Sequence, residues 1–245
     1  MLTNTIVEVS ADSHHALHSM LMAPAFEPAL APGAVGRRLF TIRAADSFGQ
    51  RSQANILVNR MYATRGYHAN SLLKDPSSNR ITLIAGEGDA IIGTLTIGFD
   101  GPTGLLADDL FRTETEAVRD AGREVCEFTK FAVDGVVKSK RVLASLFHVA
   151  YAIAHRLNGI HVLIIEVNPR HAGYYSKLLG FEVKGSLRLN RRVNAPAVLL
   201  SLELSHARRQ IELLGGRPEL AATERSLYPY FFSPAEEAGF LNRIK

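Results

Sequence analysis

The chain has 245 residues, 47% hydrophobic and 21% charged, a composition that excludes a disordered or fibrous protein. Its formal charge of +4 and pI near 9.3 favour an anionic partner without choosing among phosphate ligands, acidic proteins and nucleic acids. The single cysteine, Cys126, excludes an internal disulfide, and no apolar run approaches the roughly 18 residues of a membrane span, so we expect a cytoplasmic protein without a signal peptide.

The N-terminal part is predicted to contain an arm, a strand and a helix. Residues 1–36 include the Pro- and Ala-rich stretch MAPAFEPALAPGAVG and read as an arm or linker. RRLFTIRAA, at 37–45, is a predicted strand. A helix capped by Asp46 or Ser47 follows and runs to about residue 65. Its apolar stripe consists of Ala54, Leu57, Val58 and Met61.

The middle of the chain predicts a hairpin and a third strand. After a short helix and loop over 66–79, RITLIAGE and AIIGTLTIGFD flank a tight Gly88-Asp89 turn, which is typical of a β-hairpin. GPTGLLADDLF reads as a loop with a carboxylate pair, and a charged segment leads from it into the strand EVCEFTKFAVD, at 124–134.

The C-terminal half predicts two helices and three further strands. A long helix is expected from Ser139 to Asn158, followed by the buried strand HVLIIEV. Asn168 can cap the next helix, Pro169 suits its first turn, and Gly180 can end it. Two strands, EVKGSLRLN and PAVLLSLEL, are joined by a basic turn, and residues 205–245 read as a helical extension. The order predicts an α/β protein with a mixed sheet of about seven strands flanked by helices.

Four segments in this order resemble the GNAT superfamily, and within it the bacterial long-chain N-acyl amino acid synthases, distant relatives of the acyl-homoserine lactone synthases. They are RMYATRGY, GTLTIGF with GPTGLLADDLF, EVCEFTKFAVD, and NPRHAGYYSKLLGFE. The resemblance covers residues 37–204 and implies a GNAT acyltransferase core with a mostly antiparallel sheet. It also implies an enzyme that moves a long acyl chain from acyl carrier protein to the amine of an amino acid or similar small amine.

Two departures from the family pattern bear on the donor. Lys130 stands where the family usually has arginine, and the two cations differ at bidentate sites. KSKRVLA, at 138–144, replaces the glycine-rich phosphate loop of acetyl-CoA-dependent GNAT enzymes. A carrier-bound phosphopantetheine, with one phosphate, suits this loop better than the pyrophosphate of CoA. The expected donor is therefore an acyl-phosphopantetheine thioester, on acyl carrier protein or as acyl-CoA.

Acyl transfer needs a held donor, a deprotonated amine, a stabilised oxyanion and help for the departing thiol. The donor phosphate is expected at the start of the long helix, whose N–H groups and basic residues attract anions. The residues expected to contact the donor are Lys138, Ser139, Lys140, Arg141 and His171, with Phe128 and Lys130 beside the thioester. On the strand, Glu127 is the expected general base or a clamp on the acceptor's ammonium, with a β-bulge expected between Glu127 and Lys130.

The resemblance also implies a tyrosine as general acid and an acceptor-side helix. Tyr175 is the first candidate for the acid and Tyr174 the alternative, although buried tyrosines are commonly packing residues. Arg60 and Tyr62 are the expected contacts of the acceptor. We expect no metal, since His14, His15 and His18 lie in the arm, and no nucleic acid, since no aromatic–basic motif is present.

Two other functions remain open at the level of sequence. One is a short-chain, acyl-CoA-dependent N-acetyltransferase, which would require tight CoA binding by the glycine-free loop. The other is a catalytically silent GNAT-like module that binds an acyl thioester. The helical extension would either cover an acyl tunnel or form a contact in a homodimer.

Overall fold

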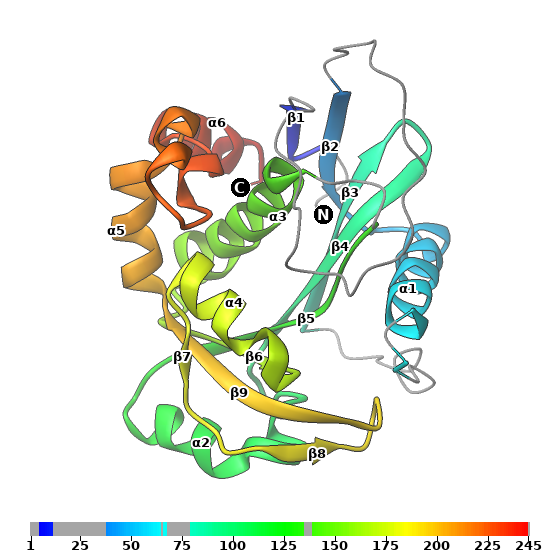
Figure 1. Cartoon of the computed structure of the whole chain (residues 1–245), viewed down its shortest axis with the longest axis vertical. Coiled ribbons are helices and arrows are strands. Elements are labelled where there is room, and N and C mark those ends of the chain that lie inside the picture. Colours follow the sequence, from blue (N-terminus) through cyan, green and yellow to red (C-terminus); the bar gives the residue numbers. More distant parts are fainter. Residues whose placement is uncertain (1–4, 12–37, 65, 68–78, 135–138, 245) are drawn as a thin grey trace.

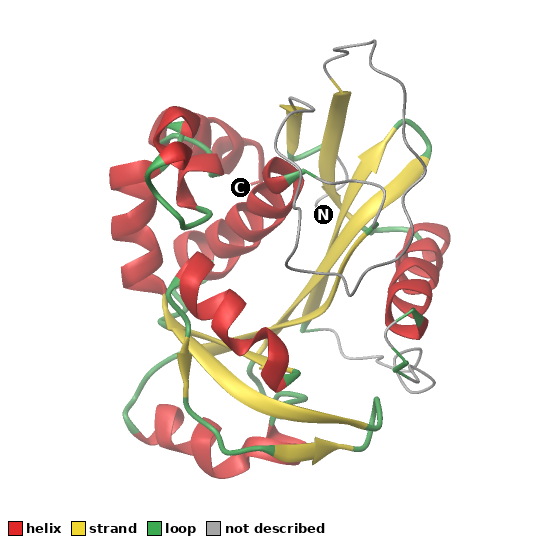
Figure 2. Ribbon diagram, viewed as in Figure 1, coloured by secondary structure: helices red, strands yellow, loops and turns green. Residues whose placement is uncertain are grey.

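The computed structural model describes residues 5–11, 38–64, 66–67, 79–134 and 139–244. The described strands form one nine-stranded sheet with helices on both faces (Figure 1, Figure 2). The helix predicted over 66–79 lies almost wholly outside the described residues. The strands are β1 (Val7–Ala11), β2 (Arg38–Ala44), β3 (Arg80–Glu87), β4 (Ala90–Phe99), β5 (Val125–Val133), β6 (Val162–Val167), β7 (Glu182–Val183), β8 (Arg188–Asn190) and β9 (Ala195–Glu203).

The helices include the three long ones that the sequence predicts. Ser47, one of the two expected caps, caps α1, and α4 starts at Asn168-Pro169 and ends at Gly180 in the left-handed conformation, as expected. Ser139, where the long helix was predicted to begin, caps α3. Six residues near the end of the predicted long helix, Ala152–Leu157, form a π-helix, η1. The helices are α1 (Phe48–Ala63), α2 (Asp108–Asp120), α3 (Lys140–Tyr151), η1 (Ala152–Leu157), α4 (Pro169–Leu179), α5 (Leu204–Leu214), the 3₁₀ turns η2 (Pro218–Ala222) and η3 (Tyr228–Tyr230), and α6 (Pro234–Ile244).

The strand order across the sheet is β1-β2-β3-β4-β5-β6-β9-β7, and β8 also pairs with β9. Every pair is antiparallel except β5–β6, so the mixed, mostly antiparallel sheet is confirmed. The predicted number of about seven strands is wrong, because there are nine. One additional strand is β1, and the other arises because the strand predicted over 182–190 is broken into β7 and β8.

Both differences have local causes. In β1 the buried Val7 and Val9 alternate with the exposed Glu8, a half-buried strand pattern of only five residues. Between β7 and β8, the amides of Lys184 and Gly185 both donate to Leu199 O, which interrupts the ladder. A Cβ at Gly185 would lie 2.6 Å from the Phe111 ring, so only glycine allows this close approach.

Two groups of helices cover the two faces of the sheet. The face toward α3 carries the main hydrophobic core, which continues into α5 and α6. On the other face, α2 packs over β5, β6 and β9, and α1 packs over β4 and β5. Within the described residues, no helix is long and apolar enough to span a membrane.

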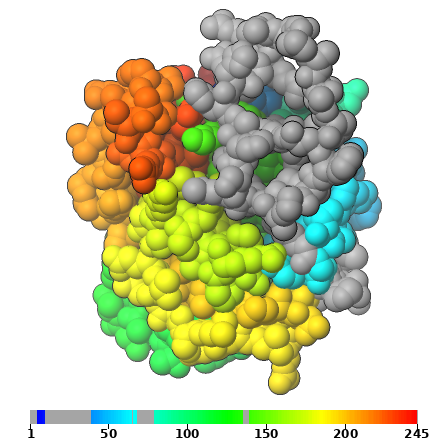
Figure 3. All heavy atoms as spheres, in the orientation of Figure 1, coloured from blue at the N-terminus to red at the C-terminus, as the bar shows by residue number. Residues whose placement is uncertain are grey.

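The C-terminal part packs closely on the rest of the protein. Figure 3 shows it, in orange and red, against the green to yellow-green segment from α3 to α4. Leu227 N donates to Leu178 O over 2.9 Å, Tyr228 Oη donates to Leu179 O over 2.8 Å, and Arg243 Nε reaches Ile6 O at 3.1 Å. The division into an arm, a core over 37–204 and an extension over 205–245 stays a prediction, although β1 lies within the predicted arm.

Candidate active site

A cavity opens where β5 and β6 stop pairing. The parallel ladder covers only Val125↔Val162, Cys126↔Leu163 and Glu127↔Ile164, and the two strands then diverge (Figure 1). The cavity between their continuing ends is also lined by α4, by the end of α1 and by the β8–β9 turn. Carboxyl ends of diverging strands, with a helix start beside them, are a common place for a ligand in α/β proteins.

A β-bulge shapes the β5 wall of this cavity. Thr96 pairs with Thr129 and Thr94 pairs with Ala132, so β5 contains one extra residue, and Lys130 has a φ of +50°. The expected bulge is therefore present, but it follows Thr129 instead of lying between Glu127 and Lys130. It reverses the alternation of the strand, so that Phe131 packs on Phe147 with 5.2 Å between ring centroids.

Glu127 lines the cavity and is only 2% exposed. Its Oε1 accepts from Leu106 N at 2.9 Å and pairs with Arg80 Nη1 at 2.9 Å, and its Oε2 accepts from Ala107 N at 3.0 Å. Burial raises the pKa of this carboxyl, against the opposing influence of Arg80 and the two amides. A Cβ at Gly98 would lie 2.9 Å from Glu127 Cγ, so a glycine makes room for the pair.

A second carboxylate, the largely buried Glu166, lines the same cavity, and the sequence-based assignment does not include it. Its Oε2 accepts from Asn190 Nδ2 at 2.5 Å and from Arg192 Nη2 at 2.6 Å. Its Oε1 is buried and has no hydrogen-bond partner among the described residues. Burial raises the pKa of Glu166, and the nearby Glu127 adds to that effect. The available signal was a lone carboxylate near the end of the apolar strand HVLIIEV.

The two tyrosines of α4 both line the cavity but differ in their surroundings. Tyr175 packs among aromatic rings, with centroids 6.5 Å from Phe147 and 6.0 Å from Phe181. The Tyr174 hydroxyl is buried without a hydrogen-bond partner in the described part of the chain, and burial raises its pKa to about 12. His171, one turn earlier, also lines the cavity, and its role as a donor contact stays a prediction.

The residues expected to bind the donor are divided between two places. Phe128 and Lys130 line the cavity with His171. Ser139, Lys140 and Arg141 form the start of α3 and do not line it. Arg141 Nη1 donates to Tyr230 O at 2.7 Å, and Lys140 Nζ lies 5.4 Å from the Tyr230 ring centroid. The C-terminal part thus occupies both cations, and Lys138 lies outside the described residues.

Of the two residues expected to contact the acceptor, one lines the cavity and the other does not. Tyr62 lines the cavity and makes an edge contact with Tyr67, with 6.0 Å between ring centroids. Tyr67 Oη accepts from Arg170 Nη2 at 2.9 Å, which ties the end of α1 to the start of α4. Arg60 does not line the cavity; its side chain is 57% exposed and pairs with Asp134 at 2.6 Å.

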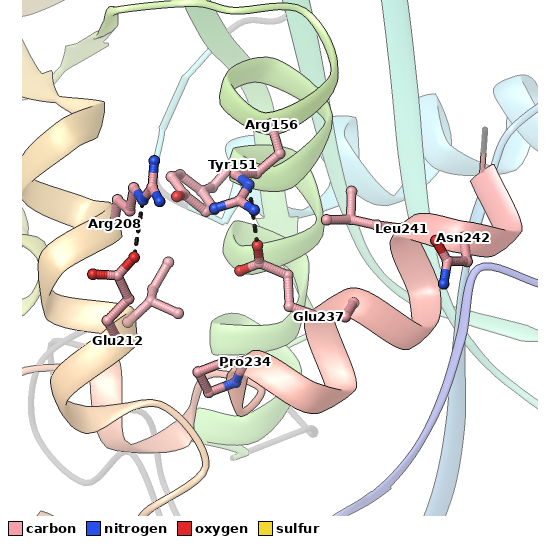
Figure 4. A pocket seen from close by; sticks show the side chains of 10 residues that line it. Tyr151, Arg156, Arg208, Glu212, Pro234, Glu237, Leu241 and Asn242 are labelled. Carbon is pink, nitrogen blue, oxygen red and sulfur yellow. Dashed lines mark hydrogen bonds and ion pairs between the residues drawn. The ribbon is translucent and has the colours of Figure 1, made fainter.

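Another cavity lies between η1, α5 and α6 (Figure 4). Its charged side chains face one another in pairs. Arg208 Nε lies 2.9 Å from Glu212 Oε1, and Arg156 Nε lies 3.5 Å from Glu237 Oε1. Because these charges neutralise each other, the cavity between β5 and β6 is the stronger candidate for a reaction.

Neither a metal site nor a cysteine nucleophile is supported by the described residues. No group of three or more His, Cys, Asp or Glu side chains there could hold a metal ion; the three histidines of the arm lie outside the described part. Cys126 is fully buried, and burial raises the pKa of its thiol well above the usual range, so it is a poor nucleophile.

Comparisons with known proteins identify a family and a solved structure that resemble this chain. The family model described as N-acyl amino acid synthase FeeM matches residues 53–203. The structure of FeeM, an N-acyl amino acid synthase from uncultured soil microbes, is 31% identical, covers 69% of this chain and 94% of its own, and superposes with a TM-score of 0.63. No curated protein sequence matches the chain.

A more distant match supports the fold alone. A protein from Lactobacillus plantarum, assigned as an N-acetyltransferase, is 15% identical, covers 67% of this chain and 98% of its own, and has a TM-score of 0.50.

Proposed function

Because the chain belongs to the FeeM family of N-acyl amino acid synthases and has the GNAT acyltransferase fold, we propose that it transfers a long-chain acyl group from acyl carrier protein to the amine of an amino acid or similar small amine. Family membership establishes the coarser part, an N-acyltransferase that uses an acyl thioester. The carrier, the acyl length and the acceptor are the proposed part.

The observation that carries the proposal is the cavity at the divergence of β5 and β6. Its walls combine aromatic side chains, among them Phe128, Phe131 and Phe147, with two carboxylates, one buried and one largely buried. An apolar wall suits an acyl chain, and a small number of fixed polar groups suits an amine and a thioester. The backbone of Phe128 to Lys130 continues past Glu127, the last residue of β5 that pairs with β6, and can hold the thioester oxygen there.

The start of α3 supports a carrier-bound donor over free CoA. The segment contains no glycine, and Lys140 and Arg141 are engaged by the C-terminal part. Among the described residues of this helix start, few cations remain for the several phosphates of CoA, whereas the single phosphate of a phosphopantetheine arm can use the amide groups of the first helical turn. An acidic carrier protein would also suit the exposed Arg191 of the β8–β9 turn.

The proposed chemistry is direct attack of the amine on the thioester. An amide of β5 holds the developing oxyanion, and one such donor contributes about 3 kcal/mol. A carboxylate of the cavity acts as general base or as a clamp on the ammonium, and Glu127 is the candidate that the sequence indicates. Tyr174 or Tyr175 donates to the departing sulfur. A phenol with a pKa of about 12 is a weaker acid than a thiol, whose pKa is about 8.5, so Tyr174 would donate a hydrogen bond and keep its proton.

The function can be tested by mass spectrometry of the products. The purified protein is incubated with palmitoyl-carrier protein, palmitoyl-CoA or acetyl-CoA, each with a pool of the twenty amino acids. We expect an N-palmitoyl amino acid from the carrier-bound donor, and its mass identifies the acceptor. An acetylated product from acetyl-CoA alone would replace the proposal with a short-chain acetyltransferase. Bound donor without any product would indicate a silent binding module.

A further inference from the structure

Three buried polar atoms that belong to cavity-lining residues lack hydrogen-bond partners among the described residues. They are Thr129 Oγ1, Glu166 Oε1 and Tyr174 Oη, and all three residues line the cavity. A buried polar group without a partner is costly, and such groups in folded proteins usually have a functional cause or meet a bound molecule. Only one of the three atoms belongs to a carboxylate.

The two carboxylates of the cavity differ in how many donors they already have. Glu127 receives two backbone amides and the Arg80 guanidinium, shared over both of its oxygens. These contacts hold the loop before α2 against β5, so Glu127 has a structural task. Glu166 binds its donors through Oε2 alone, and its Oε1 is left for another donor.

The position of Glu166 is fixed by its neighbours. Asn190 holds Oε2, and Arg192 donates to the same atom while also donating to Leu106 O at 2.6 Å and to Asp109 at 2.8 Å. The β8–β9 turn therefore holds Oε2 of the carboxylate and makes no hydrogen bond to Oε1. The Glu166 side chain is only 12% exposed, which limits competition from bulk water.

We propose that Glu166 is the catalytic base that accepts a proton from the acceptor amine. This inference rests on the proposed function and assigns one of its steps. An ammonium proton passes to Oε1, the free amine forms a C–N bond with the thioester carbon, and the C–S bond breaks. The thiolate takes the second nitrogen proton, and Glu166 later releases its proton to solvent. Glu127 then keeps the structural role.

The test compares three variants with the wild-type enzyme, using the donor and acceptor that the product assay identifies. Glu166→Gln and Glu127→Gln each remove one carboxylate of the cavity, and Glu212→Gln is the matched control in the other cavity. We expect Glu166→Gln to lower kcat/KM by about 100- to 10,000-fold. The deficit should shrink as the pH approaches the pKa of the acceptor's ammonium, because solution then supplies the free amine.

A purely structural role would give a different pH dependence. The groups around Glu166 that carry or change charge are Arg192, Asp109, Glu127, Arg80 and the cavity-lining His171. All of them remain in Glu166→Gln, so a deficit that is equal at every pH would overturn the proposal. Two other results would also overturn the proposal. One is a kcat/KM of Glu166→Gln within about twofold of wild type. The other is that Glu127→Gln, and not Glu166→Gln, loses the fall in kcat/KM at low pH (the acidic limb of the pH–rate profile).

Two further outcomes separate this inference from the proposed function. If the wild-type protein forms no product with any donor, the proposed function fails first and the inference falls with it. If Glu166→Gln does not fold, as judged by its thermal transition, Glu166→Asp carries the test. The shorter carboxylate should keep the acidic limb with at least about tenfold lower kcat, and an unchanged kcat would refute the role of Glu166.

Discussion

At the scale of single residues, the adjacent tyrosines of α4 have separable roles. Tyr174 carries a buried hydroxyl without a partner in the described chain, whereas Tyr175 contacts three aromatic rings. We expect Tyr174→Phe to lower kcat by about 10- to 100-fold, the contribution of one hydrogen bond to a charged atom. Tyr175→Phe, which keeps the packed ring, should change kcat by less than about threefold.

The measurement is steady-state kinetics on both variants, with thermal melting as the control for folding. A larger loss of kcat in Tyr175→Phe than in Tyr174→Phe, at equal stability, would reverse the assignment.

The sequence identified part of the candidate site. Glu127, Lys130, His171 and the tyrosines were found because the family motifs contain them, and all of them line the cavity. Glu166 was missed because its one local signal, a lone carboxylate near the end of an apolar strand, does not reveal its partners. Its importance depends on Asn190 and Arg192, which follow it by 24 and 26 positions and meet it only when β9 pairs with β6. Arg141 and Arg60 were expected at the site, but long-range contacts with Tyr230 and Asp134 hold them outside the cavity.

At the scale of elements, the bulge of β5 makes a prediction about stability. Lys130 has a φ of +50°, a conformation that asparagine tolerates and β-branched residues resist. We expect Lys130→Val to have a free energy of unfolding about 1–2 kcal/mol lower than Lys130→Asn. Both variants lose the ammonium, so their difference isolates the backbone strain. Urea unfolding measures it, and equal stabilities would mean that the bulge is not retained.

Elements with strong local signals were predicted correctly, and those without them were not. The Gly88-Asp89 hairpin and the caps of α3 and α4 depend on neighbouring residues alone. The helix α2 was expected to be a loop and a charged segment. Its buried positions include Asp108 and Thr115 as well as Phe111, so polar residues interrupt the apolar stripe of its inner face. Asp108 is acceptable there because it accepts from Leu105 N at 2.8 Å and from Arg119 Nη2 at 2.8 Å.

At the scale of the whole molecule, a buried pair joins the C-terminal part to α3. Phe232 N donates to His148 Nδ1 at 2.9 Å, so His148 Nε2 carries the proton that faces Glu237 Oε2 at 2.8 Å. We expect Glu237→Ala to lower the free energy of unfolding by about 1–3 kcal/mol, because it leaves a buried donor without its partner. Glu212→Gln, at an exposed pair, should change it by less than about 0.5 kcal/mol.

The same pair predicts the direction of a pH effect. Burial lowers the pKa of His148 in the folded protein, so the unfolded chain binds more protons as the pH falls below about 6.5. Stability should therefore decrease from pH 7 to pH 5.5. His148→Phe, which suits the surrounding aromatic rings, should flatten that decrease. The thermal midpoints of the wild type and of His148→Phe, each at pH 7 and pH 5.5, measure the decrease in stability. An equal decrease in the two proteins would exclude His148 as its cause.

The charge of the whole molecule bears on the donor. With a net charge of +4, the protein attracts an acidic carrier through exposed cations such as Arg191, which lies on the turn that also holds Glu166. We expect Arg191→Glu to raise KM for palmitoyl-carrier protein several-fold with kcat unchanged. Added salt should also raise KM in the wild-type protein, because charges more than about 8 Å apart are screened at 0.15 M. The control is Arg209→Glu, the same charge reversal on α5, which should have little effect on KM.

If Arg191→Glu and Arg209→Glu raise KM equally, the overall charge of the protein attracts the carrier. If neither raises KM, the carrier docks away from the β8–β9 turn.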